Sequence, residues 1–302
     1  VSFPFDHDPF PLWQSMLRDR LLFGSLLTAL LLGLFYVDHR LGSNYCVLLL
    51  ALAFAPLCTF ELLRMLDRNI PRPFVFLTVC TTLTVVLAEW IDVTLPVTWF
   101  PGWLADLPLG YVVFLLATCG FLFIPVGLGE KERIPHVVHA VFALVYVGLF
   151  FGCFVKISGM TAGGERVGLR LALTTLIICK FTDTGAYAFG RLLGKRKLAP
   201  SISPGKTLAG FFGGLVVGTA AGILCWHLLR LPHSVRLITL AFSFGAVSII
   251  AQVGDLVESA MKRHAGVKDS GRTLWAFGGA LDLADSVILA SPVAYFVFLS
   301  IL

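Results

Sequence analysis

Charged residues are scarce in this chain. Asp, Glu, Lys and Arg make up 14% of its 302 residues, whereas a soluble globular domain carries about 25%. Hydrophobic residues reach 57%, and the mean hydropathy is +0.88. This balance excludes an ordinary soluble domain. It predicts an all-α fold that is a polytopic integral membrane protein.

Motifs for disulfides, thiolate metal sites and nucleic acids are missing. The seven cysteines all lie in apolar stretches and no C-x-x-C pair occurs, so we expect free thiols packed in the membrane. The net charge is +5, but no basic patch is interleaved with aromatic residues. We therefore predict no nucleic-acid partner. His136 and His139 stand beside a loop, and we interpret them as interfacial residues and not as metal ligands.

Long apolar runs dominate what is present. A helix needs about 20 apolar residues to cross the hydrocarbon core, and several runs reach that length once the small and polar residues at their ends are included. We predict about nine transmembrane helices. The runs are Leu21–Val37, Val47–Phe60, Phe74–Ala88, Tyr111–Leu128, Val137–Val155, Leu169–Ile178, Phe211–Leu229, Leu237–Val253 and Val287–Leu302.

The basic residues predict an orientation. Most of the 23 Lys and Arg residues fall at the N-terminus and in the even-numbered loops, and cytoplasmic loops carry such an excess. We expect a cytoplasmic N-terminus. The third loop, Glu89 to Pro108, is acidic and rich in Trp, which suits the outer face.

We divide the chain into residues 1–155, which form helices with few motifs, and residues 156–302, which carry the polar segments suited to catalysis.

Two polar segments of the second part indicate a site. In the first, Lys180 to Arg191, helical spacing places Asp183 on one stripe with Lys180 and Arg191, and a carboxylate within a membrane indicates function by default. Neutralisation of Asp183 by Lys180 one turn away is the alternative for this segment alone. In the second, Ser203-Pro204-Gly205-Lys206-Thr207, hydroxyls and a lysine before a helix suit phosphate binding. The Walker spacing is absent. The glycines that follow at every fourth position, Gly214, Gly218 and Gly222, indicate close helix packing.

A third polar segment, Gly254 to Gly271, continues to the head of the last run. Asp255, Glu258 and Lys262 share one helical face, and Asp282 and Asp285 follow at a spacing of three. Four carboxylates beside a phosphate-binding segment are suited to Mg²⁺, which takes oxygen ligands and shares them with phosphates. A salt-bridged helix surface is the alternative for this segment alone.

Together these segments closely resemble the phosphatidate cytidylyltransferase (CDP-diacylglycerol synthase) family. The family's C-terminal signature is matched in order by Ser259-Ala-Met-Lys262-Arg263, Lys268-Asp269, Gly278-Gly279, Asp282 and Asp285. An upstream stretch of the family is matched by 183–191, 198–200 and 203–207. The resemblance implies a plasma-membrane enzyme with a cytoplasmic active site and a possible homodimer. Its reaction would convert CTP and phosphatidate to CDP-diacylglycerol and pyrophosphate.

The same resemblance assigns roles to the polar residues. Asp255, Asp282, Glu258, Asp183 and Asp285 would hold Mg²⁺, and Ser203, Pro204, Lys206 and Thr207 would hold the nucleotide phosphates. Lys262, Arg263 and Lys268 would neutralise the lipid phosphate or pyrophosphate, and Asp269 would orient the base or ribose. Departures from the family pattern stand at Ala209, Trp275, Phe277 and Leu283. These departures leave an inactive relative open. A transferase for another lipid phosphate also stays open, because no residue pattern specifies the tail, as does an anion transporter, which would equally use an intramembrane Asp183.

Overall fold

The computed structural model describes residues 32–95, 107–128 (backbone alone from 125), 133–232, 235–267, 270–271, 273 and 278–302. Over these residues the regular structure is helical apart from two short hairpins, which confirms the all-α prediction. Within the described ranges, six helical segments are long and apolar enough to cross a membrane. They are α2 (Tyr45–Leu66), α3 (Arg72–Thr94), α5 to α6 (Ile134–Ser158), α8 (Leu208–Leu228), α9 (Leu237–His264) and α10 (Ala280–Ile301).

The predicted number of about nine spans is not confirmed. The helix α4 (Leu109–Leu128) is described with its side chains only over Leu109–Ile124, and that part is shorter than a span. The helix α7 (Gly168–Leu193) is long enough, but it is interrupted by charged residues such as Lys180 and Asp183. Most of the first predicted run lies outside the described residues. Length and composition therefore support a multi-pass protein with a smaller set of clear spans.

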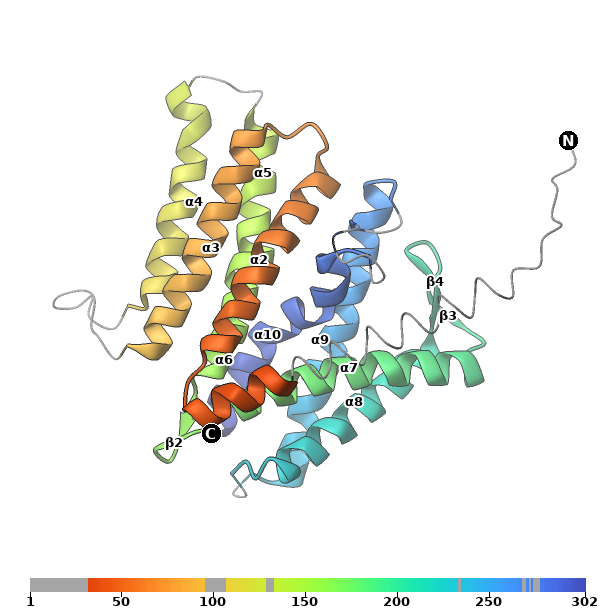
Figure 1. Cartoon of the computed structure of the whole chain (residues 1–302). Coiled ribbons are helices and arrows are strands. Elements are labelled where there is room, and N and C mark those ends of the chain that lie inside the picture. Colours follow the sequence, from red (N-terminus) through yellow and green to blue (C-terminus); the bar gives the residue numbers. More distant parts are fainter. Residues whose placement is uncertain are drawn as a thin grey trace, which may run out of the picture.

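The helices form two groups that differ in direction (Figure 1). The helices α2, α3 and α4 stand side by side with the segment made of α5 (Ile134–Ala143), a π-helix (Leu144–Leu149) and α6 (Phe150–Ser158). The pair α7 and α8 crosses this group at a steep angle, and α9 and α10 lie between. Two antiparallel hairpins flank α7: β1 (Thr161–Ala162) with β2 (Glu165–Arg166), and β3 (Lys197–Ala199) with β4 (Ser203–Thr207).

Close contact between α7 and α8 depends on the glycines of α8. A side-chain carbon at Gly214 would lie 2.8 Å from the carbonyl oxygen of Thr182, and one at Gly222 would lie 2.7 Å from Ile178. Gly218 faces Thr182 even more closely. The prediction that these glycines mark helix packing is confirmed, because no larger residue fits between the two backbones.

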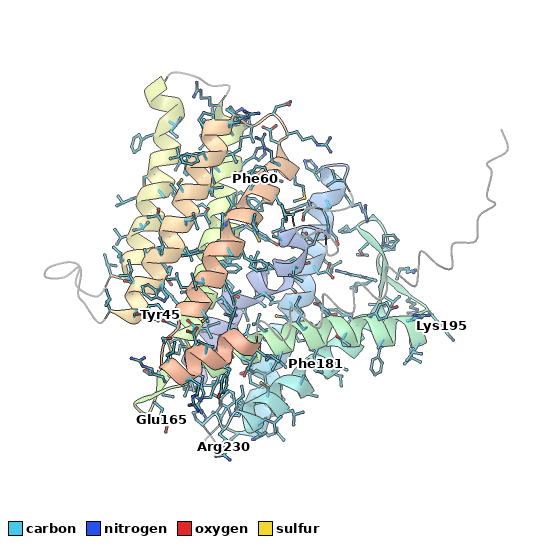
Figure 2. The ribbon with its side chains drawn as sticks, in the orientation of Figure 1. Tyr45, Phe60, Glu165, Phe181, Lys195 and Arg230 are labelled. Carbon is cyan, nitrogen blue, oxygen red and sulfur yellow. The ribbon has the colours of Figure 1, made fainter. Side chains whose placement is uncertain are left out.

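Large apolar side chains cover much of the outer surface. Phe60 on α2 and Phe181 on α7, both labelled in Figure 2, are 44% and 49% exposed. A soluble protein seldom exposes contiguous apolar patches of this kind. This surface suits lipid contact. All seven cysteines are free, as the sequence predicts.

One polar prediction is wrong in its placement. The expected third loop begins at Glu89, but α3 continues to Thr94, and Glu89 is buried inside the bundle. Its carboxylate pairs with Lys156 of α6 at 2.7 Å. The Lys156 ammonium also lies 3.7 Å from the centre of the Tyr111 ring. Pairing within the bundle lets both charges enter the helical region, which run length alone does not reveal.

Candidate active site

A cavity of about 460 Å³ lies where α7, the β3–β4 hairpin, α8 and α9 meet. All three polar segments singled out in the sequence contribute side chains to it. The residues that line it are Asp183, Ala186, Tyr187, Gly190, Arg191, Leu198, Ser203, Gly205, Lys206, Thr207, Gly210, Phe211, Gln252 and Asp255. The fold thus brings together segments that are up to 72 residues apart in the chain.

The hairpin positions Ser203 and Lys206. Ala199 pairs with Ser203 and Lys197 with Thr207 in an antiparallel register with a bulge between them. The segment predicted to bind phosphate, Ser203 to Thr207, is therefore a strand. Thr207 is the N-cap of α8, and its hydroxyl accepts a hydrogen bond from the Gly210 N–H at 3.1 Å. Capping satisfies a helix-terminal donor, so this hydroxyl has a structural partner as well as a place in the cavity wall.

The second half of α7 forms another wall of the cavity. Asp183 lies 3.7 Å from Lys180 one turn before it, and Arg191 donates a hydrogen bond to the Tyr187 hydroxyl at 3.1 Å. These spacings confirm the predicted helical stripe. Lys180 also donates to the carbonyl oxygen of Leu283 on α10 at 3.2 Å, so α7 is tied to the helix that carries the last acidic residues.

Three carboxylates gather between α9 and α10. One oxygen from each of Asp255, Glu258 and Asp285 lies within 4.8 Å of the others. Glu258 and Asp285 are buried, whereas the side chain of Asp255 is 39% exposed and borders the cavity. Asp255 also pairs with Lys206 of the hairpin at 2.8 Å. The cluster therefore joins the cavity through Asp255.

The donor set of this cluster fits a divalent cation such as Mg²⁺. Carboxylate oxygens are the side-chain ligands that Mg²⁺ prefers. The buried Oε1 of Glu258 has no hydrogen-bond partner among the described residues, and an unsatisfied buried oxygen is costly. A cation at this position would satisfy it. The three acids of the cluster are among the five residues that the sequence assigns to metal binding.

Asp282 and Asp183 are the other two predicted metal ligands. They do not belong to the cluster of Asp255, Glu258 and Asp285. Asp282 pairs with Lys262 at 3.0 Å and accepts the Gly279 N–H at 2.9 Å. It therefore helps to begin α10, where a carboxylate is favoured by the helix dipole. Lys262 is shared between Asp282 and Glu258, which lies 2.7 Å away. The ligand role of Asp282 and Asp183 stays a prediction.

Two of the remaining predicted residues, Arg263 and Pro204, are described by the structure, and neither lines the cavity. Arg263 donates from Nε to the carbonyl oxygen of Ile202 at 3.2 Å and so fastens α9 to the hairpin. Pro204 is exposed and does not line the cavity. Lys268 and Asp269 lie outside the described residues, as do Trp275 and Phe277.

Sequence reasoning missed Glu61 of α2. Its buried carboxylate accepts hydrogen bonds from the Ser270 hydroxyl at 3.2 Å, the Leu281 N–H at 2.9 Å and the Thr273 hydroxyl. It thereby holds the residues that precede α10. The second predicted run stops at Phe60, so the sequence predicts a loop position for Glu61. Because α2 continues to Leu66, a lone acid inside an apolar helix was the available signal.

Two further residues were missed. Gln252 lines the cavity and donates to the carbonyl oxygen of Phe211 at 3.3 Å. Tyr146 lies on the π-helix and has a buried hydroxyl without a hydrogen-bond partner among the described residues. Single-turn π-helices frequently occur at functional sites. No sequence pattern marks either residue.

The fold and the site define a class: a polytopic membrane protein with an acidic cluster beside a lysine-bearing cavity. The family model described as "Cytidylyltransferase family" matches residues 18–301. The chain therefore belongs to the cytidylyltransferase family.

Curated relatives agree with this membership. The chain is 32% identical over 270 residues to a protein of Staphylococcus haemolyticus named phosphatidate cytidylyltransferase, covering 88% of this chain and 95% of that one. It is 40% identical over 154 residues to the protein of the same name from Bacillus subtilis and 43% identical over 150 residues to that of Staphylococcus epidermidis. These two alignments cover 51% and 50% of this chain, and span 55% and 54% of those relatives.

Proposed function

We propose that this chain is a metal-dependent phosphatidate cytidylyltransferase, which converts CTP and phosphatidate to CDP-diacylglycerol and pyrophosphate. One observation carries the proposal. Three separate polar segments, each matching the family in sequence, converge on one cavity whose Lys206 and Asp255 connect it to the acidic cluster. The names of the relatives point to the same reaction.

The proposed reaction joins two anions without a nucleophilic side chain. An oxygen of the lipid phosphate attacks the α-phosphorus of CTP. The bond from that phosphorus to the bridging oxygen breaks, and pyrophosphate leaves with its electron pair. Positioning and neutralisation of charge dominate such transfers. Lys206, with Ser203 beside it, is placed to hold nucleotide phosphates at the cavity wall.

Asp255, Glu258 and Asp285 would hold Mg²⁺, with Asp183 and Asp282 near them. When bound, the ion supplies charge neutralisation at the phosphates. The pair between Lys206 and Asp255 would then exchange partners, because the lysine is attracted to phosphate and the carboxylate to the cation. Lys262, Arg263 and Lys268 remain proposed partners of the lipid phosphate or pyrophosphate, and Asp269 of the base or ribose.

The lipid tails would stay in the bilayer beside α7 and α8, whose outer faces carry exposed Phe181 and Phe212. We further propose a plasma-membrane location, with about nine spans once α4, α7 and the first apolar run are included. The N-terminus and the cavity would face the cytoplasm, because basic residues gather on that side. A homodimer is part of the same proposal.

The test is an assay of the detergent-purified full chain with CTP labelled at the α-phosphate or, separately, at the γ-phosphate. With phosphatidate and Mg²⁺ we expect the α-label in the lipid phase and the γ-label in pyrophosphate. A chelator should abolish both signals. The two labels distinguish cytidylyl transfer from hydrolysis of CTP, which would leave the lipid unlabelled.

Each other result has a defined meaning. If another lipid phosphate, such as a polyprenyl phosphate, is labelled and phosphatidate is not, the reaction class holds and the acceptor is wrong. If folded protein labels neither lipid, the chain is a non-catalytic relative and the proposal fails. Transfer that persists after removal of divalent cations would disprove the role of the metal.

A further inference from the structure

A second group of metal-binding side chains lies apart from the candidate active site. One ligand atom from each of Asp67, His136 and His139 lies within 4.8 Å of the others. Asp67 ends α2, and the two histidines stand one turn apart on α5. None of the three lines the cavity described above. The sequence shows the histidines only as a lone pair beside a loop and therefore favours an interfacial role. Asp67 is 69 positions away from His136, so no local pattern relates the two.

The geometry around Asp67 directs its carboxylate toward α5. The residue has an extended backbone after the last turn of α2. One carboxylate oxygen, Oδ1, accepts a hydrogen bond from the Asn69 N–H at 2.8 Å. The other, Oδ2, lies 3.0 Å from Nδ1 of His136. A hydrogen-bonded carboxylate with one remaining oxygen is typical of a metal ligand.

The histidines are held in place but incompletely satisfied. The ring of His136 packs against Phe74, with 5.9 Å between the ring centres, and its side chain is 21% exposed. The Nδ1 atom of His139 is buried and has no hydrogen-bond partner among the described residues. A simple ion pair between Asp67 and His136 would explain the first contact. It leaves the position of His139 unexplained.

We propose that Asp67, His136 and His139 form a binding site for one divalent transition-metal ion of the Zn²⁺ type. Two imidazole nitrogens and one carboxylate oxygen make a borderline donor set, which favours zinc and its neighbours over Mg²⁺. Three protein ligands leave a further coordination position open. The ion would fasten α2 to α5 at the end of α2 beyond Glu61.

The first test uses full-length protein purified without a histidine tag and stripped with a chelator. Co²⁺ is titrated in while excess Mg²⁺ occupies the acidic cluster, and the visible absorption of bound Co²⁺ is followed. Zn²⁺ is then added in competition. We expect one Co²⁺ per chain, displaced by Zn²⁺, and a higher melting temperature with Zn²⁺, because binding to the folded state stabilises it.

Variants localise the ion. His139→Ala and Asp67→Asn should each weaken Co²⁺ binding by at least about tenfold, since loss of even an outer-shell partner costs about 10- to 100-fold. His39→Ala removes an exposed histidine elsewhere and should bind as the wild type does. Asp255→Asn should also retain binding. Loss of Co²⁺ in Asp255→Asn, or unchanged binding in His139→Ala, overturns the proposal.

A measurement on the wild-type protein tests the site even if the variants fail to fold. X-ray absorption at the zinc edge of the Zn²⁺-loaded protein should show two imidazole ligands. A first shell made only of oxygen, or no stoichiometric uptake of Zn²⁺, would mean that Asp67 and His136 form an ion pair and that no metal site exists here.

Discussion

Two groups of buried charge lie in different parts of this molecule. Between α3 and α6, Glu89 and Lys156 form a closed pair, 1% and 7% exposed, with the Tyr111 ring against the ammonium. Between α9 and α10, the described residues place four carboxylates, Asp255, Glu258, Asp282 and Asp285, around two lysines, Lys206 and Lys262.

The two groups differ in the balance between positive and negative charge. The first group neutralises itself, so it needs nothing from outside the chain and serves helix packing. The second carries an excess of negative charge, because its four carboxylates are paired with only two lysines among the described residues. Buried charge is tolerated when it is paired. An unbalanced group therefore indicates a binding site, and a balanced group indicates structure.

The largest expected effect separates the two groups by activity. Asp255→Asn should lower the rate of CDP-lipid formation by about 100- to 1,000-fold, because the loss of one metal ligand removes several kcal/mol of charge stabilisation. The fold should persist, since the substitution relieves repulsion among acids. Initial rates with α-labelled CTP over a range of Mg²⁺ concentrations measure this. Glu165→Gln, at a 79% exposed carboxylate in β2, is the control. Near-normal activity of Asp255→Asn would remove it from the metal site.

Substitution in the balanced pair of Glu89 and Lys156 should lower the stability of the fold. Glu89→Gln leaves the Lys156 ammonium buried without its counter-ion, and breaking such a pair costs about 3–5 kcal/mol. Equilibrium unfolding in mixed micelles measures the free energy of unfolding of each variant. Glu89→Gln combined with Lys156→Met should recover most of the loss. Activity per folded molecule should stay within about twofold of wild type. If Glu89→Gln abolishes activity without destabilising the protein, the pair belongs to the chemistry and the comparison fails.

Glu61 connects the two parts of the molecule, and its replacement should have an intermediate effect. Glu61→Gln retains the shape but supplies only one accepting oxygen, so hydrogen bonds worth about 1.5–3 kcal/mol are weakened. We expect activity to fall about tenfold through displacement of the N-terminus of α10. Amide hydrogen exchange should also become faster at Leu281, whose N–H binds Glu61. Unchanged exchange at Leu281 would contradict this positioning role.

Much of the site could be predicted from the sequence because its residues lie at regular helical spacing. Glu258 and Lys262 are one turn apart, and their pairing follows from that spacing. The spacing of Asp282 and Asp285 places them on neighbouring turns of α10, but it does not tell which one faces the cluster. The structure shows that Asp282 begins the helix and binds Lys262, while Asp285 joins Asp255 and Glu258.

Contacts between distant segments were not predictable. Glu61 and Ser270 are separated by 209 positions, and no local pattern relates them. Hydropathy locates the middle of each span but not its ends. The sequence therefore predicts a loop from Glu89, whereas α3 continues to Thr94. The predicted division at residue 155 stays a prediction. Glu61 nevertheless shows that the first part supplies a buried carboxylate to the second.

The smallest expected effect is a change in the free energy of unfolding when glycine is replaced by alanine. Two glycines, Gly218 and Gly120, are compared. Gly218→Ala introduces a carbon against Thr182 on α7, and such overpacking costs about 1–3 kcal/mol. Gly120→Ala on α4 meets nothing within 4 Å, so it should stabilise the helix by up to about 1 kcal/mol. Unfolding in mixed micelles measures both. Opposite signs would show that close approach of α7 and α8, which form two walls of the cavity, requires glycine. Equal effects would mean that α8 tolerates a wider spacing and that its glycines do not fix the cavity.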